Sequence, residues 1–314
     1  MPSDGVREPR LSVIVPCHNS ARTIGLQLQA LAQQREAPPF EVVLVDNRST
    51  DDLAGAVEPW REHLAVTLVE AGAMANPGYA RNVGVAHARA KVLAFCDSDD
   101  YVSRDWVRAA AEAMDTVAVA NGGATPVDEG HFAQGSGHLD ELLEAMQVTG
   151  TLEVPTAPVP YPILLGGSCV IHRETYQSVG GYDLAVPYGV EDNDLALRLQ
   201  AAGQVIARAP GMQLAYRTRA EDDQPLRRQF RSGYRHLLLA HRHQLFGRSP
   251  SLPRGWYLGL PRCAAAALRM LLRPRSRDWG NLGRRAALQA GLLAGHLRYG
   301  VFGRPPEARP WTAW

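Results

Sequence analysis

The sequence predicts an α/β protein with a mostly parallel, doubly wound sheet, helices on both faces of the sheet, and a helical extension at its C-terminal end. Three observations predict this class. Short apolar runs recur along the first hundred residues, segments with helical spacing lie between them, and polar clusters follow the runs. Strands buried on both faces form continuous apolar runs, and their alternation with helices is typical of parallel sheets.

Four apolar runs are the predicted strands: Leu11 to Pro16, Val42 to Asp46, Val66 to Glu70 and Lys91 to Phe95. The helical segments between them have apolar residues spaced i, i+4, i+7, first at Ile24, Leu28 and Leu31 and then at Leu53, Val57 and Trp60. Ser49 and Thr50 give a cap signal for the second helix. Asn76 and Pro77 start a third, which is expected to reach Ala90.

The polar clusters "PCHN", "DNRSTDD" and "CDSDD" follow the first, second and fourth predicted strands. Parallel α/β sheets bind ligands at the carboxyl ends of their strands, so the three clusters should converge on one rim. Asp97 and Asp99 can both face one cation there, and their hard oxygen atoms suit Mg²⁺ or Mn²⁺ with phosphate oxygens as further ligands. The alternative is an acidic surface turn in which Asp100 or Ser103 caps the next helix.

Composition and charge divide the chain of 314 residues into two units. It is 46% hydrophobic and has a formal net charge of +1, but residues 221–314 hold 17 arginines and only five acidic residues. We therefore expect a catalytic unit at 1–220 and a basic, mainly helical extension at 221–314. The four cysteines are widely spaced and the first residues lack an apolar run, which favours a reducing compartment, the cytoplasm.

The middle and the end of the chain are harder to interpret. Residues 122–138 are rich in glycine and small polar residues and predict a loop, and Leu139, Leu142, Leu143 and Met146 then have helical spacing. In the basic extension, arginines interrupt every apolar run before the roughly 18 residues that a spanning helix needs. This extension either packs on the catalytic unit or lies on the anionic inner face of a membrane. Without a base-reading motif, nucleic acid is not an expected partner.

Five motifs occur in order between about residues 10 and 216: "SVIVPCHN", "EVVLVDNRSTDD", "GYARNVGVAHARAKVLAFCDSDD", "GGSCVIHRETYQSVGGYD" and "VEDNDLALRLQAAG". Together they resemble the family 2 inverting glycosyltransferases with the GT-A fold. The resemblance implies an enzyme that moves one sugar from a nucleotide-diphosphate sugar to a hydroxyl of a small-molecule, lipid-linked, glycan or peptide acceptor. A divalent cation, Mn²⁺ or Mg²⁺, would assist the transfer.

The resemblance also implies a set of site residues. Asp192 would be the catalytic base, and Glu191 would orient it or contact the acceptor. Asp99 would bind the metal ion, with Asp97 in the metal or ribose region. The residues expected around the nucleotide sugar are Pro16, His18, Asp46, Arg81, Asp97, Ser98, Gly166 and Gly167. The structural alternative is that Glu191, Asp192 and Asp194 serve only to place negative charge in the first turn of a helix.

Departures from the family pattern affect the expected substrates. Asp46 is followed by Asn47 and Arg48 in place of an acidic residue and a glycine, which leaves the base of the donor open. A UDP-sugar remains the favoured donor, with GDP- and dTDP-sugars as alternatives. The Gln-x-x-Arg-Trp signature of processive synthases is absent, which favours transfer of a single sugar. A dinucleotide-binding GxGxxG and a P-loop lysine are absent as well. The remaining rivals are a sugar nucleotidyltransferase of related fold and a non-catalytic nucleotide-sugar-binding module.

Overall fold

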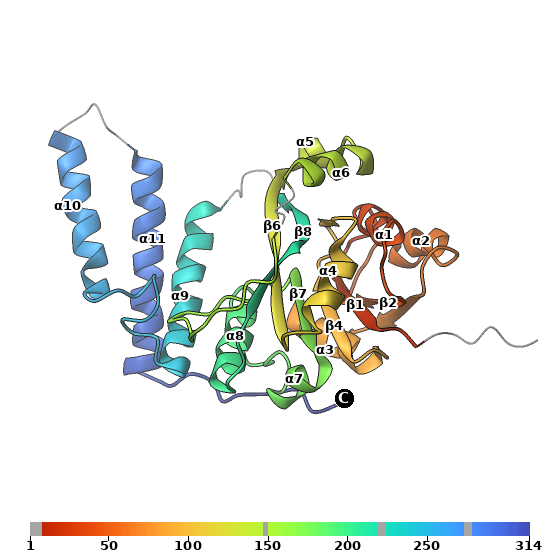
Figure 1. Ribbon diagram of the computed structural model, residues 1–314. Helices are drawn as coiled ribbons and strands as arrows, with labels where there is room; N and C mark the ends of the chain where they lie inside the picture. Colours follow the sequence, from red (N-terminus) through yellow and green to blue (C-terminus); the bar gives the residue numbers. More distant parts are fainter. Residues whose placement is uncertain (1–7, 147–149, 219–223, 273–277) are drawn as a thin grey trace, which may run out of the picture.

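The computed structural model describes residues 8–146, 150–218, 224–272 and 278–314. Its centre is an eight-stranded sheet in the order β3-β2-β1-β4-β7-β6-β8-β5 (Figure 1). Two hydrophobic cores lie on its opposite faces, each beneath a layer of helices. The doubly wound α/β class is therefore confirmed.

One half of the sheet is parallel, as predicted. Its strands are β1 (Leu11–Cys17), β2 (Phe40–Asp46), β3 (Val66–Glu70) and β4 (Val92–Cys96). β1 pairs in parallel with β2 on one side and with β4 on the other, and β2 pairs with β3. The continuous apolar runs arise because β1, β2 and β4 are buried on both faces.

The other half of the sheet is mixed. It contains β5 (Tyr101–Val102), β6 (Val119–Asp128), β7 (Ser168–His172) and β8 (Ala207–Thr218). β7 is antiparallel to β4 and β6, β5 is antiparallel to β8, and β6 is parallel to β8. The loop predicted at residues 122–138 is wrong, because β6 runs through it as far as Asp128 and two helices, α5 (Glu129–Phe132) and α6 (Ser136–Ala145), occupy most of the rest. Tertiary packing requires a glycine at position 122, because a Cβ on Gly122 would collide with Ser168 and Met212.

The helices cover both faces of the sheet. One face carries α1 (Ile24–Ala32), α2 (Leu53–Val57) with a 3₁₀ turn (Glu58–Trp60), α4 (Trp106–Ala113) and α6 (Ser136–Ala145). The other carries α3 (Pro77–His87), α7 (Arg173–Ser178) and α8 (Glu191–Ala201), while α5 (Glu129–Phe132) follows β6. Asn76 caps α3 as predicted, but α3 ends at His87, and Asp52 caps α2 in place of Ser49 or Thr50.

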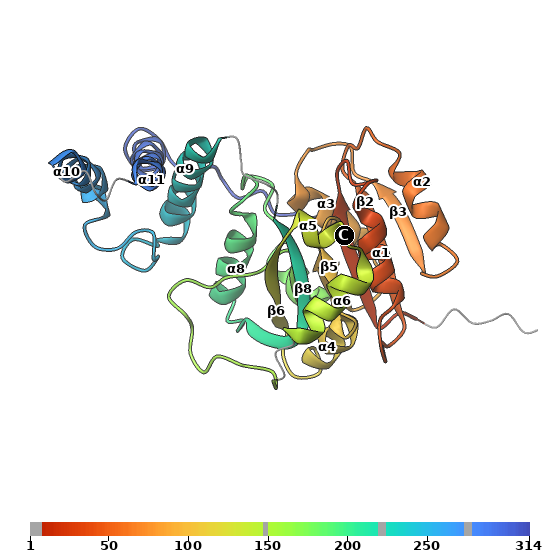
Figure 2. The same ribbon diagram turned by 90° about the horizontal axis from the view of Figure 1, so that it is seen from above.

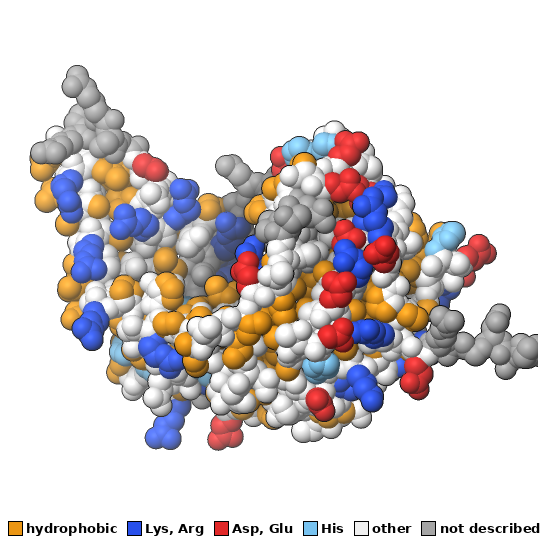
Figure 3. All heavy atoms as spheres, in the orientation of Figure 1, with side chains coloured by type: hydrophobic (Ala, Val, Ile, Leu, Met, Phe, Trp, Pro, Cys, Tyr) orange, Lys and Arg blue, Asp and Glu red, His pale blue; other side chains and the backbone are white. Residues whose placement is uncertain are grey.

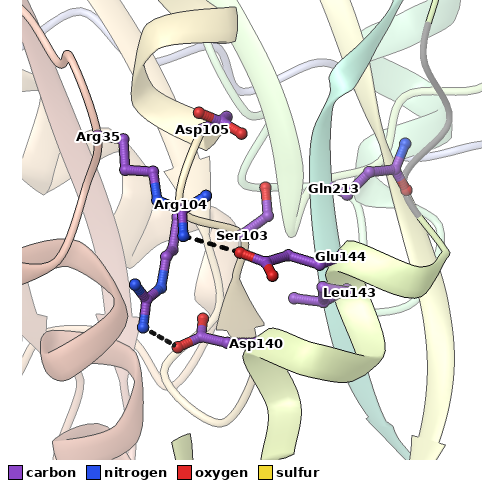
Figure 4. Close-up of a pocket in the computed structure, with 8 residues that line it drawn as sticks. All are labelled: Arg35, Ser103, Arg104, Asp105, Asp140, Leu143, Glu144 and Gln213. Carbon is purple, nitrogen blue, oxygen red and sulfur yellow. Dashed lines mark hydrogen bonds and ion pairs between the residues drawn. The ribbon is translucent and has the colours of Figure 1, made fainter. Parts of the chain in front are cut away.

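Ion pairs fasten α6 to the body of the sheet, as Figure 4 shows. Arg104 bonds Asp140 at 2.7 Å and Arg35 bonds Glu144 at 2.8 Å. The hollow between these side chains is only about 20 Å³, room for a water molecule and not for a substrate. We therefore assign this pocket a structural role.

The C-terminal extension is a group of helices at one end of the molecule: α9 (Pro225–His243), a 3₁₀ turn (Trp256–Leu258), α10 (Gly259–Leu272), α11 (Trp279–His296) and a π turn (Leu297–Val301). The predicted boundary at 220/221 lies outside the described residues. In Figures 1 and 2, α9, α11 and α10 lie side by side with α10 outermost. None of the helices in the described ranges is both long and apolar enough to cross a bilayer.

Buried ion pairs attach α9 to α8. Asp194 of α8 accepts a hydrogen bond of 2.8 Å from His243 and one of 2.7 Å from Arg198, and Arg242 lies 3.3 Å from the same carboxylate. Burial alone would raise the pKa of Asp194, but the hydrogen bonds and charges of His243 and Arg198 outweigh burial and lower it. At this contact α9 packs on α8.

Candidate active site

Two adjoining cavities open at the carboxyl ends of the parallel strands. The larger has a volume of about 640 Å³ and lies over the segments that follow β1, β2 and β4. The smaller, about 360 Å³, lies between the first turn of α8 and the segment before β7. Arg81, Asp97 and Tyr188 line both cavities, so the two meet at these side chains. The polar clusters converge on one rim, where α/β sheets bind ligands.

Arg81 joins the acidic motif after β4 to the acidic turn of α8. Its side chain is only 4% exposed, its Nη2 donates a hydrogen bond of 2.6 Å to Asp97, and its Nη1 lies 3.8 Å from Asp192. α3 can bring Arg81 this close because Gly84 lets the helix pack tightly against β1 and β2. Two carboxylates far apart in the sequence therefore share one buried cation.

Asp192 lies in the first turn of α8 and faces the smaller cavity. Its Oδ1 accepts a hydrogen bond of 2.9 Å from the hydroxyl of Tyr182, and its side chain is 32% exposed. A Cβ on Gly166 would collide with this carboxylate. Burial raises the pKa of Asp192, while the charge of Arg81 and the Tyr182 hydroxyl counteract part of the rise. An accessible carboxylate with a raised pKa is suited to take a proton near neutral pH.

Glu191 lines the same cavity, but its carboxylate is directed at its own backbone. Its Oε2 accepts hydrogen bonds from the N–H groups of Gly189 and Val190, the latter at 2.9 Å. Burial, followed by the charge of Asp192, raises the pKa of Glu191 to about 7. Through these two hydrogen bonds, Glu191 stabilises the turn that leads into α8.

Asp97, Ser98 and Asp99 all line the larger cavity. The Ser98 hydroxyl lies 2.7 Å from that of Ser20, which ties the acidic motif to the segment after β1. The next residue, Asp100, is buried, and its Oδ1 accepts a hydrogen bond of 3.0 Å from the backbone N–H of Arg217. Burial, with a further contribution from the charge of Asp97, raises the pKa of Asp100 to about 8.

Arg217, near the end of β8, holds the acidic motif at residues 97–100 in place. Its Nε donates to the carbonyl of Asp99 at 2.7 Å, and its Nη1 donates to Glu129 at 2.7 Å. The guanidinium also lies 3.8 Å from the ring centre of Phe132, a cation–π distance. The loop that carries Asp99 is thereby held against β8 and α5.

Oxygen atoms suited to a hard cation converge near Gly167. A Cβ on Gly167 would lie 2.7 Å from Oδ2 of Asp97 and 3.6 Å from Oδ2 of Asp100, and that second oxygen has no hydrogen-bond partner among the described groups. Within the described part of the chain, no three His, Cys, Asp or Glu side chains are placed to hold a metal ion by themselves. Mg²⁺ is often held by one or two carboxylates plus phosphate oxygens, so the residues fit a cation that arrives with a phosphorylated ligand.

The far side of the larger cavity is built by the ends of β1 and β2. Pro16 and His18 line it, and His18 Nδ1 lies 2.9 Å from the carbonyl of Asn47. Asp46 is not among the residues that line this cavity: its Oδ1 accepts a hydrogen bond of 2.8 Å from Ser49 N–H. Asn47 lines it instead, with its amide donating to the carbonyls of Ala71 and Met74, both at 2.7 Å.

Sequence reasoning missed three residues that support this site: Tyr182, Arg217 and Asn47. Tyr182 follows the glycine pair Gly180 and Gly181, a turn signal that marks it in retrospect. The sequence around Arg217 carries no such signal, because β8 brings it to the acidic motif only through tertiary pairing. Asn47 stands out in the sequence only as a departure from the family pattern.

Comparisons with known proteins identify the family of this chain. Residues 12–180 match the family model described as glycosyl transferase family 2, and residues 147–233 match a model described as the N-terminal domain of galactosyltransferase. A poly(ribitol-phosphate) beta-N-acetylglucosaminyltransferase, TarS, of Staphylococcus aureus is 38% identical over 109 residues. That match covers 34% of this chain and about a fifth of TarS (19%). Validoxylamine A glucosyltransferase of Streptomyces hygroscopicus subsp. limoneus is 33% identical over 131 residues, covering 40% of this chain and 27% of that protein.

Two solved structures share the fold over most of the chain. The mannosyltransferase PcManGT from Pyrobaculum calidifontis, in complex with GDP-Man and Mn²⁺, aligns with a TM-score of 0.61 and 21% identity, over 92% of this chain and 86% of that one. S. aureus TarS 1-349 in complex with UDP-GlcNAc aligns with a TM-score of 0.53 and 18% identity, over 91% of each chain. These likenesses show the GT-A architecture.

Proposed function

Because the chain belongs to glycosyl transferase family 2, we propose that it moves one sugar from a nucleotide-diphosphate sugar to an acceptor hydroxyl, with inversion at the anomeric carbon and Asp192 as the base. The observation that carries this proposal is the position of Arg81, which bridges Asp97 and Asp192 where the two cavities meet. Donor and acceptor would occupy adjoining spaces, with the reacting atoms at the junction.

The larger cavity is the proposed donor site. Pro16, His18 and Asn47 would contact the nucleoside, while Asp97, Ser98 and Asp99 would face the diphosphate. The two structural neighbours were solved with UDP-GlcNAc and with GDP-Man, which supports a nucleotide sugar as the donor class. We favour a UDP-sugar and place Gly166 and Gly167 beside the transferred sugar. A Cβ on Gly166 would strike the carboxylate of Asp192, and one on Gly167 that of Asp97, so both glycines adjoin the reacting groups.

Asp99 and Asp97 would hold a divalent cation, Mn²⁺ or Mg²⁺. Two observations support a cation in this corner. The buried Oδ2 of Asp100 has no hydrogen-bond partner in the described part of the chain, and Asp97 and Asp100 converge on Gly167. Bound there, the cation would act as a Lewis acid on the leaving diphosphate. Arg217 would keep the metal-binding loop in place through its bond to the Asp99 carbonyl.

The smaller cavity is the proposed acceptor site. The acceptor oxygen would form a bond to the anomeric carbon while its proton passes to Asp192, and the bond from that carbon to the diphosphate would break with its electron pair on the leaving group. One displacement inverts the carbon and leaves no covalent sugar on the protein. Tyr182 and Arg81 would hold the Asp192 carboxylate toward the incoming hydroxyl. General-base assistance contributes roughly 10²- to 10⁴-fold to such rates.

We further propose that residues 1–220 form the catalytic unit and residues 221–314 a separate extension anchored to it. The anchor would be α9, whose Arg242 and His243 meet Asp194 of α8. Because Asp194 and Asp192 share the first turn of α8, the extension would help to hold the base in position.

Donor hydrolysis tests the proposal. The protein is incubated with Mn²⁺ and a panel of UDP-, GDP- and dTDP-sugars, and released nucleoside diphosphate is measured. Asp115→Asn is the control, at an exposed carboxylate that lines neither cavity. Slow release from one class of donor is expected. Binding without release from any donor would support a non-catalytic module, and formation of a nucleoside triphosphate from donor and pyrophosphate would support a nucleotidyltransferase.

A further inference from the structure

The outermost helix of the extension presents an apolar stripe to solvent. On α10, Leu268, Leu271 and Leu272 are 59%, 61% and 73% exposed, and the inward side of the helix packs on α11. Trp279, at the start of α11, is exposed as well. Among the described helices and strands, none lies beyond α10 at this end of the molecule (Figures 1 and 2). A run of exposed leucines on one helix face marks an interaction surface.

The charges around this stripe are almost all positive. Arg262 and Arg269 of α10 are exposed beside the leucines, and residues 225–314 contain 17 arginines against two acidic residues. One of those two, Asp278, caps α11 by accepting a hydrogen bond from Asn281 N–H. Figure 3 shows basic and hydrophobic side chains alternating along the outer helices, on a face where acidic groups are rare.

We propose that the hairpin of α10 and α11 docks on the surface of an anionic lipid bilayer. An amphipathic helix with a basic flank lies in the interface plane, with its leucines among the acyl chains and its arginines at the headgroups. Trp279 would sit at headgroup depth, where tryptophan is enriched. A second copy of this chain fits the surface less well, because a symmetric contact would bring arginines against arginines.

The hairpin is attached through α9 to α8, which carries the proposed base, so docking would also orient the candidate site. α11 packs on α9 through glycines, with Gly291 and Gly295 so close to Phe230 and Tyr234 that a Cβ on either would strike their backbone. α9 in turn is held to α8 by the ion pairs of Asp194. A docked hairpin would thus hold the catalytic unit at a fixed orientation to the lipid. Docking itself does not depend on the proposed transferase activity.

Vesicle flotation with the full chain tests the proposal. At low ionic strength we expect the protein to float with vesicles of phosphatidylcholine and phosphatidylglycerol and to stay behind with phosphatidylcholine alone. Leu271→Glu should weaken binding by about tenfold or more, since burying a leucine contributes that much. Arg269→Gln should weaken it by about fivefold, the contribution of one cation near an anionic surface. The matched control is Val154→Glu, the same change at an exposed aliphatic residue of the catalytic unit, and should bind like the parent.

Three results would overturn the proposal. The first is no flotation with anionic vesicles, and the second is equal binding of Leu271→Glu and the parent. The third is a dimer in light scattering that Leu271→Glu converts to a monomer, which would assign the stripe to a second copy. Donor hydrolysis is measured on the same samples without lipid, so that failure to dock and failure of the proposed activity are told apart.

Discussion

The hydroxyl of Tyr182 donates a hydrogen bond of 2.9 Å to the carboxylate of Asp192. Tyr182 is buried, and its backbone N–H and C=O are both bonded to the side chain of Asn82, at 2.9 and 2.8 Å. The turn before α8 is therefore fixed to α3, the helix that also carries Arg81. Tyr182, which is fixed to α3, and Arg81, which belongs to α3, together orient the carboxylate of Asp192, the proposed base.

Replacing Tyr182 by Phe should slow the reaction without displacing the ring. The hydrogen bond lowers the pKa of Asp192, so its loss should raise that pKa further. We expect kcat to fall roughly tenfold and the acid limb of kcat/KM to move to higher pH by about one unit, the effect of one hydrogen bond to a charged group. A pH profile checks both effects. A limb that stays at the parent pH would show that Tyr182 only fills space.

Replacing Trp314 by Ala should weaken the support of Tyr182 from the C-terminal segment. The Trp314 ring packs against Tyr176 at a centroid distance of 5.6 Å and covers Gly181, while Trp311 N–H bonds the carbonyl of Gly180. We expect a loss of about 1 to 3 kcal/mol in the free energy of unfolding, because the ring is partly exposed.

The same variant should lower kcat with the donor KM unchanged. A control, Trp60→Ala, removes a partly buried ring of the 3₁₀ turn after α2 and should destabilise the fold without lowering kcat. Equal kinetic effects from the two tryptophan variants would contradict a positioning role for the C-terminal segment.

Replacing Asp100 by Asn should change how stability depends on pH. The folded state holds the Asp100 pKa at about 8, above the ordinary value of 3.8, so native protein keeps a proton that the unfolded chain releases. The free energy of unfolding should therefore fall as pH rises from about 4 to about 8, by at most about 6 kcal/mol. The amide of the Asp100→Asn variant carries no such charge, so urea unfolding of that variant in EDTA should show a shallower decline.

The exposed Asp115→Asn is the matched control for that experiment, because its carboxylate is 65% exposed. It should retain the decline of the parent. A parallel decline in the Asp100→Asn variant would mean that Asp100 is already charged in the folded protein at neutral pH.

Replacing Asp99 by Ala should abolish the metal dependence of nucleotide binding. Titration of the nucleoside diphosphate in Mn²⁺ should give an affinity roughly 10- to 100-fold weaker than the parent's, close to the value in EDTA, because a charge-assisted contact is lost. Asp115→Ala serves as the control. Unchanged affinity in Mn²⁺ would remove Asp99 from the proposed metal site.

The parallel half of the sheet could be predicted because strands that are buried on both faces have continuous apolar sequences. β1, β2 and β4 read as continuous apolar runs, and the polar residues that follow them reach the rim by topology alone. The four widely spaced cysteines are free and buried, in keeping with the absence of any paired spacing. A strand can be predicted from local sequence when its own residues show that both of its faces are buried.

β6 could not be predicted, because its glycines reflect contacts made at a distance. Gly122 faces Ser168 and Met212, which lie far along the chain, so its need for a small side chain is invisible locally. Pro126 lies in β6 where the register pairs the strand with β8, while the pairing with β7 is limited to Val119, Ala120 and Asn121. The supports of the site, Tyr182 and Arg217, depend on such tertiary contacts in the same way.

We propose that Asp192 removes the proton of the acceptor hydroxyl while the donor is bound beside Asp97 and Asp99. The most direct test is to measure donor affinity and turnover of Asp192→Asn in Mn²⁺. We expect donor affinity like that of the parent, and a turnover lower by roughly 10²- to 10⁴-fold, because an amide cannot accept the proton. An Asp192→Asn protein that turns over at the parent rate would contradict the claim.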